Sequence, residues 1–393
     1  MPGENWRRPL SVALVAQMAI SVIDMAVPVL GPTIMASAGV PASFVGYYAS
    51  AAAAGAIAFY LFGAGIVRRV GAERALQVGA IICAGGLLLV LTRQWWLILV
   101  AGVMIGLGFG TNAPASGVLL RKAVPRRRLR FAFSIKQAGV PFGALTAGAV
   151  LPLLSMIGGW QTALCAAAAV GVLAVIFVEL SLRNDHCPRA DDRQRTAMGS
   201  RPALQVLLSL LQLRSFRRLV VVGALLAIVQ GSLNVYLVTY LVTELQVSLV
   251  LAGGLYALFQ AASIPGRLLA GWLGDSRRLR SAMLMYSGLA SALAAVLLAT
   301  LTTGSAMVAI SAAVVFAGFV VGSWNGVLLA ESAEVAPDGM VAEAQSAVAI
   351  GIFAGFLLGP LILASGISLL GFQTTFFLLA GMALLSAAAA KWS

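Results

Sequence analysis

Three ionisable side chains, Asp24, Lys136 and Arg267, lie inside long apolar stretches of the sequence. A charge in hydrocarbon costs about 2.5 to 3.5 kcal/mol on insertion scales, so such residues are candidates for function. Asp24 is the strongest candidate, because it lies about 20 Å from the inner end of its stretch, just past the middle of a bilayer. A lone buried carboxylate is more stable protonated than charged, which suits proton coupling; a static ion pair or a hydrogen-bonded acid is the alternative explanation.

The two basic residues are placed less deeply. Lys136 lies about 8 Å into its stretch, where it either contacts substrate or extends its ammonium group to the cytoplasmic surface. A pairing with Asp24 would have to cross roughly 12 Å of depth. Arg267 lies near the cytoplasmic end of its stretch and either takes part in gating together with Asp275 or is an ordinary surface arginine beside it.

Uncharged polar residues within the apolar stretches form a second group of candidates. We expect them to line a substrate-binding cavity, and the alternative is that they join helices through hydrogen bonds. Asp24 shares a helix face with Gln17 and Ser21 at i, i+4 and i+7 spacing, so that face should point away from lipid. The candidate substrate-binding residues, in addition to Lys136, are Gln17, Asn112, Gln230, Asn234, Trp324 and Asn325.

The elements that carry these residues are predicted to be membrane-spanning helices. Apolar residues make up 61% of the sequence and charged residues only 10%, where a soluble domain has about 25% charged residues. The apolar runs are about twenty residues or longer, which is the length a helix needs to cross ~30 Å of hydrocarbon. We predict an all-α membrane protein with twelve spans, at roughly 10–36, 43–67, 74–92, 94–118, 131–155, 160–182, 216–243, 247–273, 280–301, 303–330, 341–366 and 370–390.

The net charge of +13 serves as an orientation signal. If the N-terminus is cytoplasmic, the segments on the cytoplasmic side of the membrane contain all of the 26 Lys and Arg residues except Lys136, Arg267 and Arg93. This predicts a multi-pass protein of the cell (inner or plasma) membrane with both termini cytoplasmic, a retained first span, and no nucleic-acid partner. The domains predicted are an N-terminal six-helix bundle over 1–182, a cytoplasmic linker over 183–215 and a C-terminal six-helix bundle over 216–393.

The two halves resemble each other, which favours a parallel repeat whose matched helices approach one central axis. The matched positions are Gln17 with Gln230, Ser21 with Asn234 and Asn112 with Asn325, all 213 residues apart, and Gly139 with Gly351 and Gly143 with Gly355, which are 212 apart.

Local motifs add a family resemblance. The stretch GRLLAGWLGDSRR, from Gly266 to Arg278, resembles the loop signature of major facilitator transporters, and its degenerate counterpart GAGIVRRVGAER, Gly63 to Arg74, carries Arg68 at the acidic position. The resemblance implies two six-helix bundles and transport by alternating access, with Asp275 helping to hold the outward-facing state. Gly102 stands where drug antiporters of that family carry arginine, and FSIKQAGVPFG looks more like small bacterial permeases of unassigned substrate, loosely those of small organic or inorganic anions.

These observations together favour a carrier. The sole histidine, His186, lies in the central linker and no His, Cys or carboxylate cluster falls within the spans, so we expect no enzyme activity, no cofactor and no metal site. We expect a monomer in the bilayer that carries a small solute, with a small organic anion moved together with a proton as the favoured substrate. The alternatives are a proton-coupled exporter of a small amphipathic compound and a membrane receptor that transports nothing.

Overall fold

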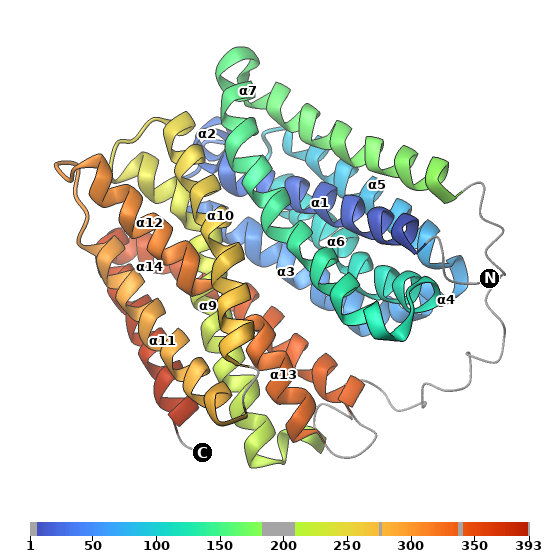
Figure 1. Ribbon diagram of the computed structural model, residues 1–393. Helices are drawn as coiled ribbons and strands as arrows, with labels where there is room; N and C mark the ends of the chain where they lie inside the picture. The colour runs from blue at the N-terminus through green and yellow to red at the C-terminus, as the bar shows by residue number, and fades with distance from the viewer. Residues whose placement is uncertain (1–5, 183–208, 275–276, 337–340, 392–393) are drawn as a thin grey trace.

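The computed structural model describes residues 6–182, 209–274, 277–336 and 341–391, and within these ranges the chain is helical with no strand. Figure 1 shows the helices as two groups that lean against each other. The predicted gating residue Asp275, His186 and most of the predicted linker fall outside the described residues.

The first group contains the helices up to residue 182. They are α1 (Arg7–Val29), α2 (Gly31–Ser37), the short 3₁₀ helix η1 (Ala42–Phe44), α3 (Val45–Phe62), α4 (Ala64–Val70), α5 (Ala72–Val90), α6 (Trp95–Ala123) and α7 (Arg126–Leu182). The second group contains α9 (Arg214–Thr243), α10 (Leu249–Leu273), α11 (Arg277–Ala299), α12 (Met307–Val321), α13 (Asn325–Val335) and α14 (Val341–Lys391).

Ten helical stretches of the described chain are long and apolar enough to cross a membrane. Two of them, α7 and α14, are interrupted by residues with non-helical backbone angles: Gly158 and Gly159 in α7, and Gly371 in α14. Gly159 and Gly371 have φ values of 80° and 77°, which glycine adopts without steric cost. Figure 1 shows α7 reversing its direction at this break. The twelve predicted spans therefore correspond to ten stretches, of which two contain a break.

Three of the predicted spans are also divided within their length. The first divides at Leu30 because Pro32 lacks the N–H that would continue the helical hydrogen bonds. The second divides at Gly63, and the tenth divides at Gly322 between α12 and α13. These breaks lie between helical segments, so they change helix direction without adding loops.

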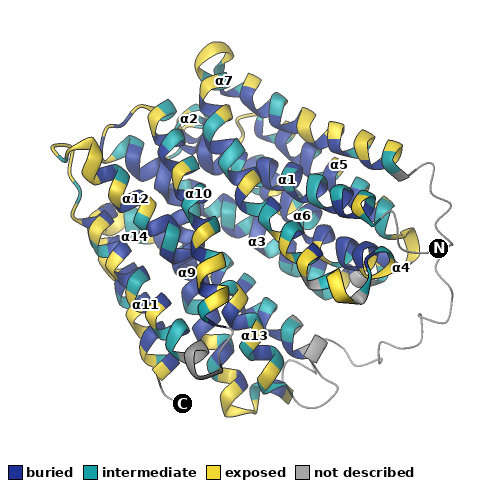
Figure 2. Cartoon of the chain, viewed as in Figure 1, coloured by how far each residue is buried: buried dark blue, intermediate teal, exposed yellow. Residues whose placement is uncertain are grey.

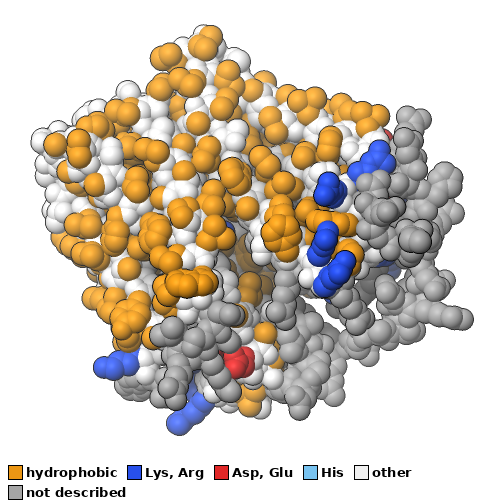
Figure 3. All heavy atoms as spheres, viewed as in Figure 1, with side chains coloured by type: hydrophobic (Ala, Val, Ile, Leu, Met, Phe, Trp, Pro, Cys, Tyr) orange, Lys and Arg blue, Asp and Glu red, His pale blue; other side chains and the backbone are white. Residues whose placement is uncertain are grey.

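The outer surface of both groups is apolar. Figure 2 shows exposed positions along the outward sides of α11 and of the second part of α7, and Figure 3 shows hydrophobic side chains over most of the visible face. Large apolar side chains such as Ile157 (79% exposed), Trp272 (74%) and Leu369 (81%) point outward. An apolar patch of this extent would aggregate in water but is stable in contact with lipid tails.

The two groups meet along α7 with α10 and along α3 with α14. Glycines allow the first pair to approach closely, since a Cβ atom on Gly148 would lie 2.8 Å from the carbonyl oxygen of Gly253. Gly351, Gly355 and Gly359 follow one another at four-residue spacing on α14 and lie against α9, so they serve packing within the second group. Small residues let helix backbones approach and gain van der Waals contact in a membrane.

The internal repeat is less regular in space than in sequence. Gly143 lies against Met18 and Ser21 of α1, whereas its predicted counterpart Gly355 lies against Ala224 and Ala227 of α9. With the offset of 213 residues found in the sequence, the counterpart of Met18 is position 231. The observed contact of Gly355 is with Ala224, which is seven residues, or about 10 Å of helix, before that position. Matched positions in the two halves therefore do not occupy equivalent surroundings.

Candidate functional site between the two helix groups

The two groups are sealed against each other at one end. Tyr236 of α9 is fully buried and its hydroxyl donates to the carbonyl oxygens of Ser43 (2.7 Å) and Pro360 (3.2 Å), and the bond to Ser43 crosses between the groups. The hydroxyl of Ser50 in α3 donates to the carbonyl oxygen of Leu357 in α14 at 2.7 Å. We call this end the sealed end.

The helix ends on the other side are rich in Lys and Arg, and we call them the basic end. Contacts hold these helix ends together within each group: the Arg128 guanidinium lies 5.5 Å from the centre of the Trp6 ring, and Arg218 donates to the carbonyl oxygen of Ala390 at 2.6 Å. Figure 3 shows the surface hollowed between α10 and the first part of α7. The described contacts between the two groups are therefore found at the sealed end, and the surface between α10 and the first part of α7 is hollowed.

Hydrogen-bonded amides join α9 to α10 and to α13 within the second group. The side-chain amide of Asn325 donates to Gln230 Oε1 at 3.0 Å. The Gln260 amide donates to Asn234 Oδ1 at 3.1 Å and to the hydroxyl of Tyr256 at 2.7 Å. Four of these five polar side chains come from α9 and α10, so the network fixes the relative rotation of those two helices.

The network reaches the first group through one contact. The hydroxyl of Tyr256 donates to the sulfur of Met25 in α1 at 3.0 Å. A Cβ atom on Gly148 of α7 would lie 2.9 Å from the Tyr256 ring, so this tyrosine fits between α1 and α7. Sequence reasoning did not select Tyr256 or Gln260 as site residues, although their i, i+4 spacing on the face that carries Arg267 was a usable signal.

Polar side chains of the first group are more deeply buried and less completely bonded. Gln17 is 3% exposed and donates to the hydroxyl of Ser21 at 3.3 Å. Asn112 is 1% exposed, and both its amide nitrogen and its oxygen lack a hydrogen-bond partner among the described residues. Trp324, at the break between α12 and α13, is fully buried and its indole nitrogen has no partner there either. A buried polar group left without a partner costs about 1 to 3 kcal/mol.

Asp24 lies near the sealed end of the hollow. Seventeen residues separate it from the start of α1 at Arg7, which corresponds to ~26 Å of helix. Its side chain is only partly buried, and it forms no hydrogen bond or ion pair with any described residue. The phenols of Tyr48 and Tyr256 lie within electrostatic reach of the carboxylate. An acid with accessible surface and no partner can exchange a proton with water that enters the hollow.

Lys136 and Arg267 lie on the two helices that cross at Gly148 and Gly253. Lys136 is twelve residues before Gly148 on α7, or ~18 Å toward the basic end, and Arg267 is fourteen residues after Gly253 on α10, or ~21 Å in the same direction. The two cations are thus at similar depth in the molecule. Neither forms an ion pair with a described residue.

The surroundings of the two cations differ. Lys136 is 4% exposed and lies one turn below Gly139, which packs on Leu14 and Gln17 of α1. Arg267 is half-buried with its guanidinium against the backbone of Gly322, and its Nε has no partner within the described chain. Asp24 is ten residues further along α1 than Leu14, or ~15 Å, so Lys136 cannot pair with it in this state.

The described residues hold no cluster of three or more His, Cys, Asp or Glu side chains that could bind a metal ion. The polar groups that the described helices carry within the membrane-spanning stretches are amides, phenols, one carboxylate and two cations. Groups of these types can bind a small polar solute through hydrogen bonds and charge.

Comparison with known proteins agrees with this arrangement. A bacterial homologue of the human lysosomal transporter Spinster, solved in an inward-facing and occupied conformation, superposes with a TM-score of 0.76 at 16% identity over 99% of this chain and 97% of the other. A mutant of the nucleoside transporter NupG superposes with a TM-score of 0.82 at 15% identity, covering 98% of each chain. A POT family transporter in complex with 5-aminolevulinic acid gives 0.76 at 14% identity, covering 97% and 95%.

At these identities the solved structures establish a common fold only. No protein with a curated description matches the sequence. The sequence does match the family described as Major Facilitator Superfamily over residues 11–347, which is most of its length. The chain therefore belongs to the Major Facilitator Superfamily, a family of membrane transporters, and is a transporter rather than an enzyme.

Proposed function

We propose that the chain is a proton-coupled carrier that moves a small organic anion by alternating access. Residues 1–182 and 216–393 act as two bodies joined by a cytoplasmic linker over 183–215, and the hollow between them is the substrate path. The basic end is cytoplasmic under this proposal, because segments rich in Lys and Arg remain on that side of a cell membrane.

The observation that carries the proposal is the unpaired, partly accessible carboxylate of Asp24. It lies deep along α1 and beside the contact between Tyr256 and Met25 at which the two groups meet. A proton bound there is exchanged with one side of the membrane while the hollow is open to that side. Closure of the hollow in the charged form would leave an unpaired carboxylate in a low-dielectric interior, which costs several kcal/mol.

The charges in the hollow favour an anionic substrate. Lys136 and Arg267 contribute two positive charges and Asp24 one negative charge, so the net charge is +1 with all three ionised and +2 once Asp24 is protonated. Protonation therefore strengthens the attraction for an anion, and binding of the anion favours protonation by the same coupling energy. This reciprocity is the requirement for symport.

Lys136 and Arg267 also explain how occupancy could control closure. The two cations lie at similar depth on α7 and α10, so bringing these helices together at the basic end moves like charges closer to each other. An anion bound between them removes this repulsion and forms charge-assisted hydrogen bonds with both side chains. The amides of Gln230, Asn234 and Asn325 are the groups we propose for orienting the remainder of the substrate, with Gln17, Asn112 and Trp324 joining them after rearrangement.

Asp24→Asn in proteoliposomes tests the proposal. The variant is expected to retain saturable counterflow of a labelled monocarboxylate and to lose accumulation driven by a pH gradient, whereas Asp24→Glu should keep both. Counterflow shows that the variant is folded, since a misfolded carrier would lose it as well. Full gradient-driven accumulation by Asp24→Asn would refute the coupling role. Accumulation of amphipathic cations in place of carboxylates would favour the exporter, and absence of counterflow for every solute tested would favour the receptor.

A further inference from the structure

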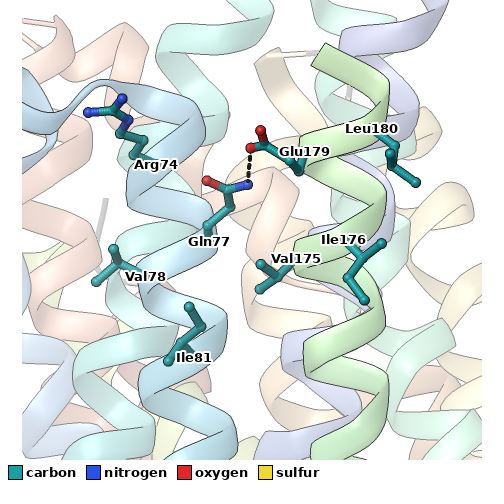
Figure 4. A pocket seen from close by; sticks show the side chains of 8 residues that line it. All are labelled: Arg74, Gln77, Val78, Ile81, Val175, Ile176, Glu179 and Leu180. Carbon is teal, nitrogen blue, oxygen red and sulfur yellow. Dashed lines mark hydrogen bonds between the residues drawn. The ribbon is translucent and has the colours of Figure 1, made fainter. Parts of the chain in front are cut away.

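A groove outside the central hollow opens between α5 and the second part of α7. It has a volume of about 490 Å³, which is within the range of ligand sites. Figure 4 shows the two helices side by side, with side chains from both along the groove. Its lining is formed by Arg74, Gln77, Val78, Ile81, Val175, Ile176, Glu179 and Leu180.

The apolar part of this groove faces lipid. Val78 is 47% exposed, Ile81 56%, Ile176 48% and Leu180 60%, so their side chains meet the hydrocarbon of the bilayer. Along α5 the lining extends from Arg74 to Ile81, seven residues or ~10 Å. A surface of this shape accepts a flexible apolar chain along the helices.

The polar part of the groove lies at the basic end. Arg74 is two residues after the start of α5 at Ala72, and Glu179 is three residues before the last described residue of α7, Leu182. Both side chains are thus within ~5 Å of their helix ends, at the level of lipid headgroups. The groove is therefore amphipathic along its length, like a membrane lipid.

Glu179 is the unusual member of this group. Its side chain is exposed on the lipid-facing surface, and its one partner among the described residues is the neutral amide of Gln77, which donates to Oε2 at 3.0 Å. Figure 4 shows this bond across the groove and Arg74 directed to the other side of α5. Arg74 and Glu179 form no ion pair with each other. A carboxylate at the edge of hydrocarbon needs a cation, and no described protein group supplies one.

We infer that the groove binds an inner-leaflet phospholipid whose headgroup carries a primary ammonium, with the ammonium at Glu179 and an acyl chain along Val78 and Ile176. An ammonium has three N–H donors for the carboxylate, whereas a trimethylammonium headgroup has none. A glycerol headgroup leaves the lipid with a net negative charge and nothing cationic to place beside Glu179.

Native mass spectrometry of the full chain after detergent delipidation tests the inference. The probes are phosphatidylethanolamine, phosphatidylcholine and phosphatidylglycerol with the same acyl chains, added in equal amounts. The wild-type protein is expected to retain phosphatidylethanolamine about tenfold over each competitor, as charge-assisted hydrogen bonds of this kind allow. In Glu179→Gln the ratio of retained phosphatidylethanolamine to each competitor should fall to about one. The control is Glu244→Gln, which removes an exposed acid at the sealed end and should leave this ratio unchanged.

Two results would overturn the inference. Equal retention of the three lipids by the wild-type protein would show an ordinary lipid-contacting surface, and an unchanged preference in Glu179→Gln would place the selectivity elsewhere. An unchanged elution volume and melting temperature show that the variant is folded. The assay involves no transport, so its outcome is independent of the proposed function.

Discussion

Removal of one hydroxyl group should weaken the sealed end of the molecule. In Tyr236→Phe the ring remains buried, but the carbonyl oxygens of Ser43 and Pro360 lose the donor that lies 2.7 Å and 3.2 Å from them. Ser43 belongs to the first helix group and Tyr236 to the second, so this bond exists only while the two groups are in contact.

The size of the effect follows from what is left unpaired. A buried acceptor without a donor costs about 1 to 3 kcal/mol, and that cost applies to the closed arrangement alone, since water reaches the same carbonyls once this end opens. The equilibrium between open and closed sealed ends should therefore shift about 5- to 150-fold toward the open form. The fold itself should be preserved, because no apolar contact is removed.

The shift can be measured by electron spin resonance as the distance between two labels, one at Gln94 and one at Thr303. Gln94 belongs to the first helix group and Thr303 to the second, and both residues are exposed at the sealed end. The labels are introduced after replacement of the three native cysteines. A longer distance population should grow in Tyr236→Phe. The matched control is Tyr286→Phe, which loses the hydroxyl of a tyrosine that is 56% exposed and should change nothing. Identical distance distributions for the two variants would refute the role assigned to the Tyr236 hydroxyl.

Three further predictions concern the hollow and its closure. Arg267→Gln should raise the KM for anion counterflow about tenfold or more through loss of a charge-assisted bond, and an unchanged KM would remove Arg267 from the substrate path. Asn325→Leu leaves a buried amide oxygen without its donor and should lower the free energy of unfolding by ~1 to 3 kcal/mol, measured by thermal shift in detergent. Gly253→Val should separate α7 from α10 and abolish transport, whereas Gly254→Val, where no atom lies within 4 Å of an added Cβ, should transport normally; equal activity of both would contradict the close packing.

Much of the fold could be predicted from composition and charge because the bilayer restricts the choices of the chain. Apolar stretches of this length must be helical to satisfy their backbone groups, and the family resemblance in the loop motifs was confirmed by the family match over 11–347. The breaks at Leu30, Gly63 and Gly322 were not predicted, since a short change of helix direction leaves the hydropathy of a span unaltered.

The candidate site was predicted less completely. Sequence could place Asp24 at depth and assign polar residues to spans, because depth depends only on the rise per residue. It could not predict that Gln230 bonds to Asn325 while Asn112 remains unpartnered, or that Tyr236 closes one end. These outcomes depend on how helices distant in sequence are rotated and shifted against each other.

The sequence by itself therefore determined that the protein lies in a lipid bilayer. It also determined the approximate positions of the helices and which charged residues lie within the membrane. Each of these depends on how a segment interacts with lipid and water, and not on which other helices it packs against. The tertiary structure alone decided that Lys136 and Arg267 lie at comparable depth, because Gly148 and Gly253 bring α7 and α10 together. It also decided that Asp24 has no partner among the residues that the structure describes, since pairing depends on which side chains the packed helices bring within a few ångströms.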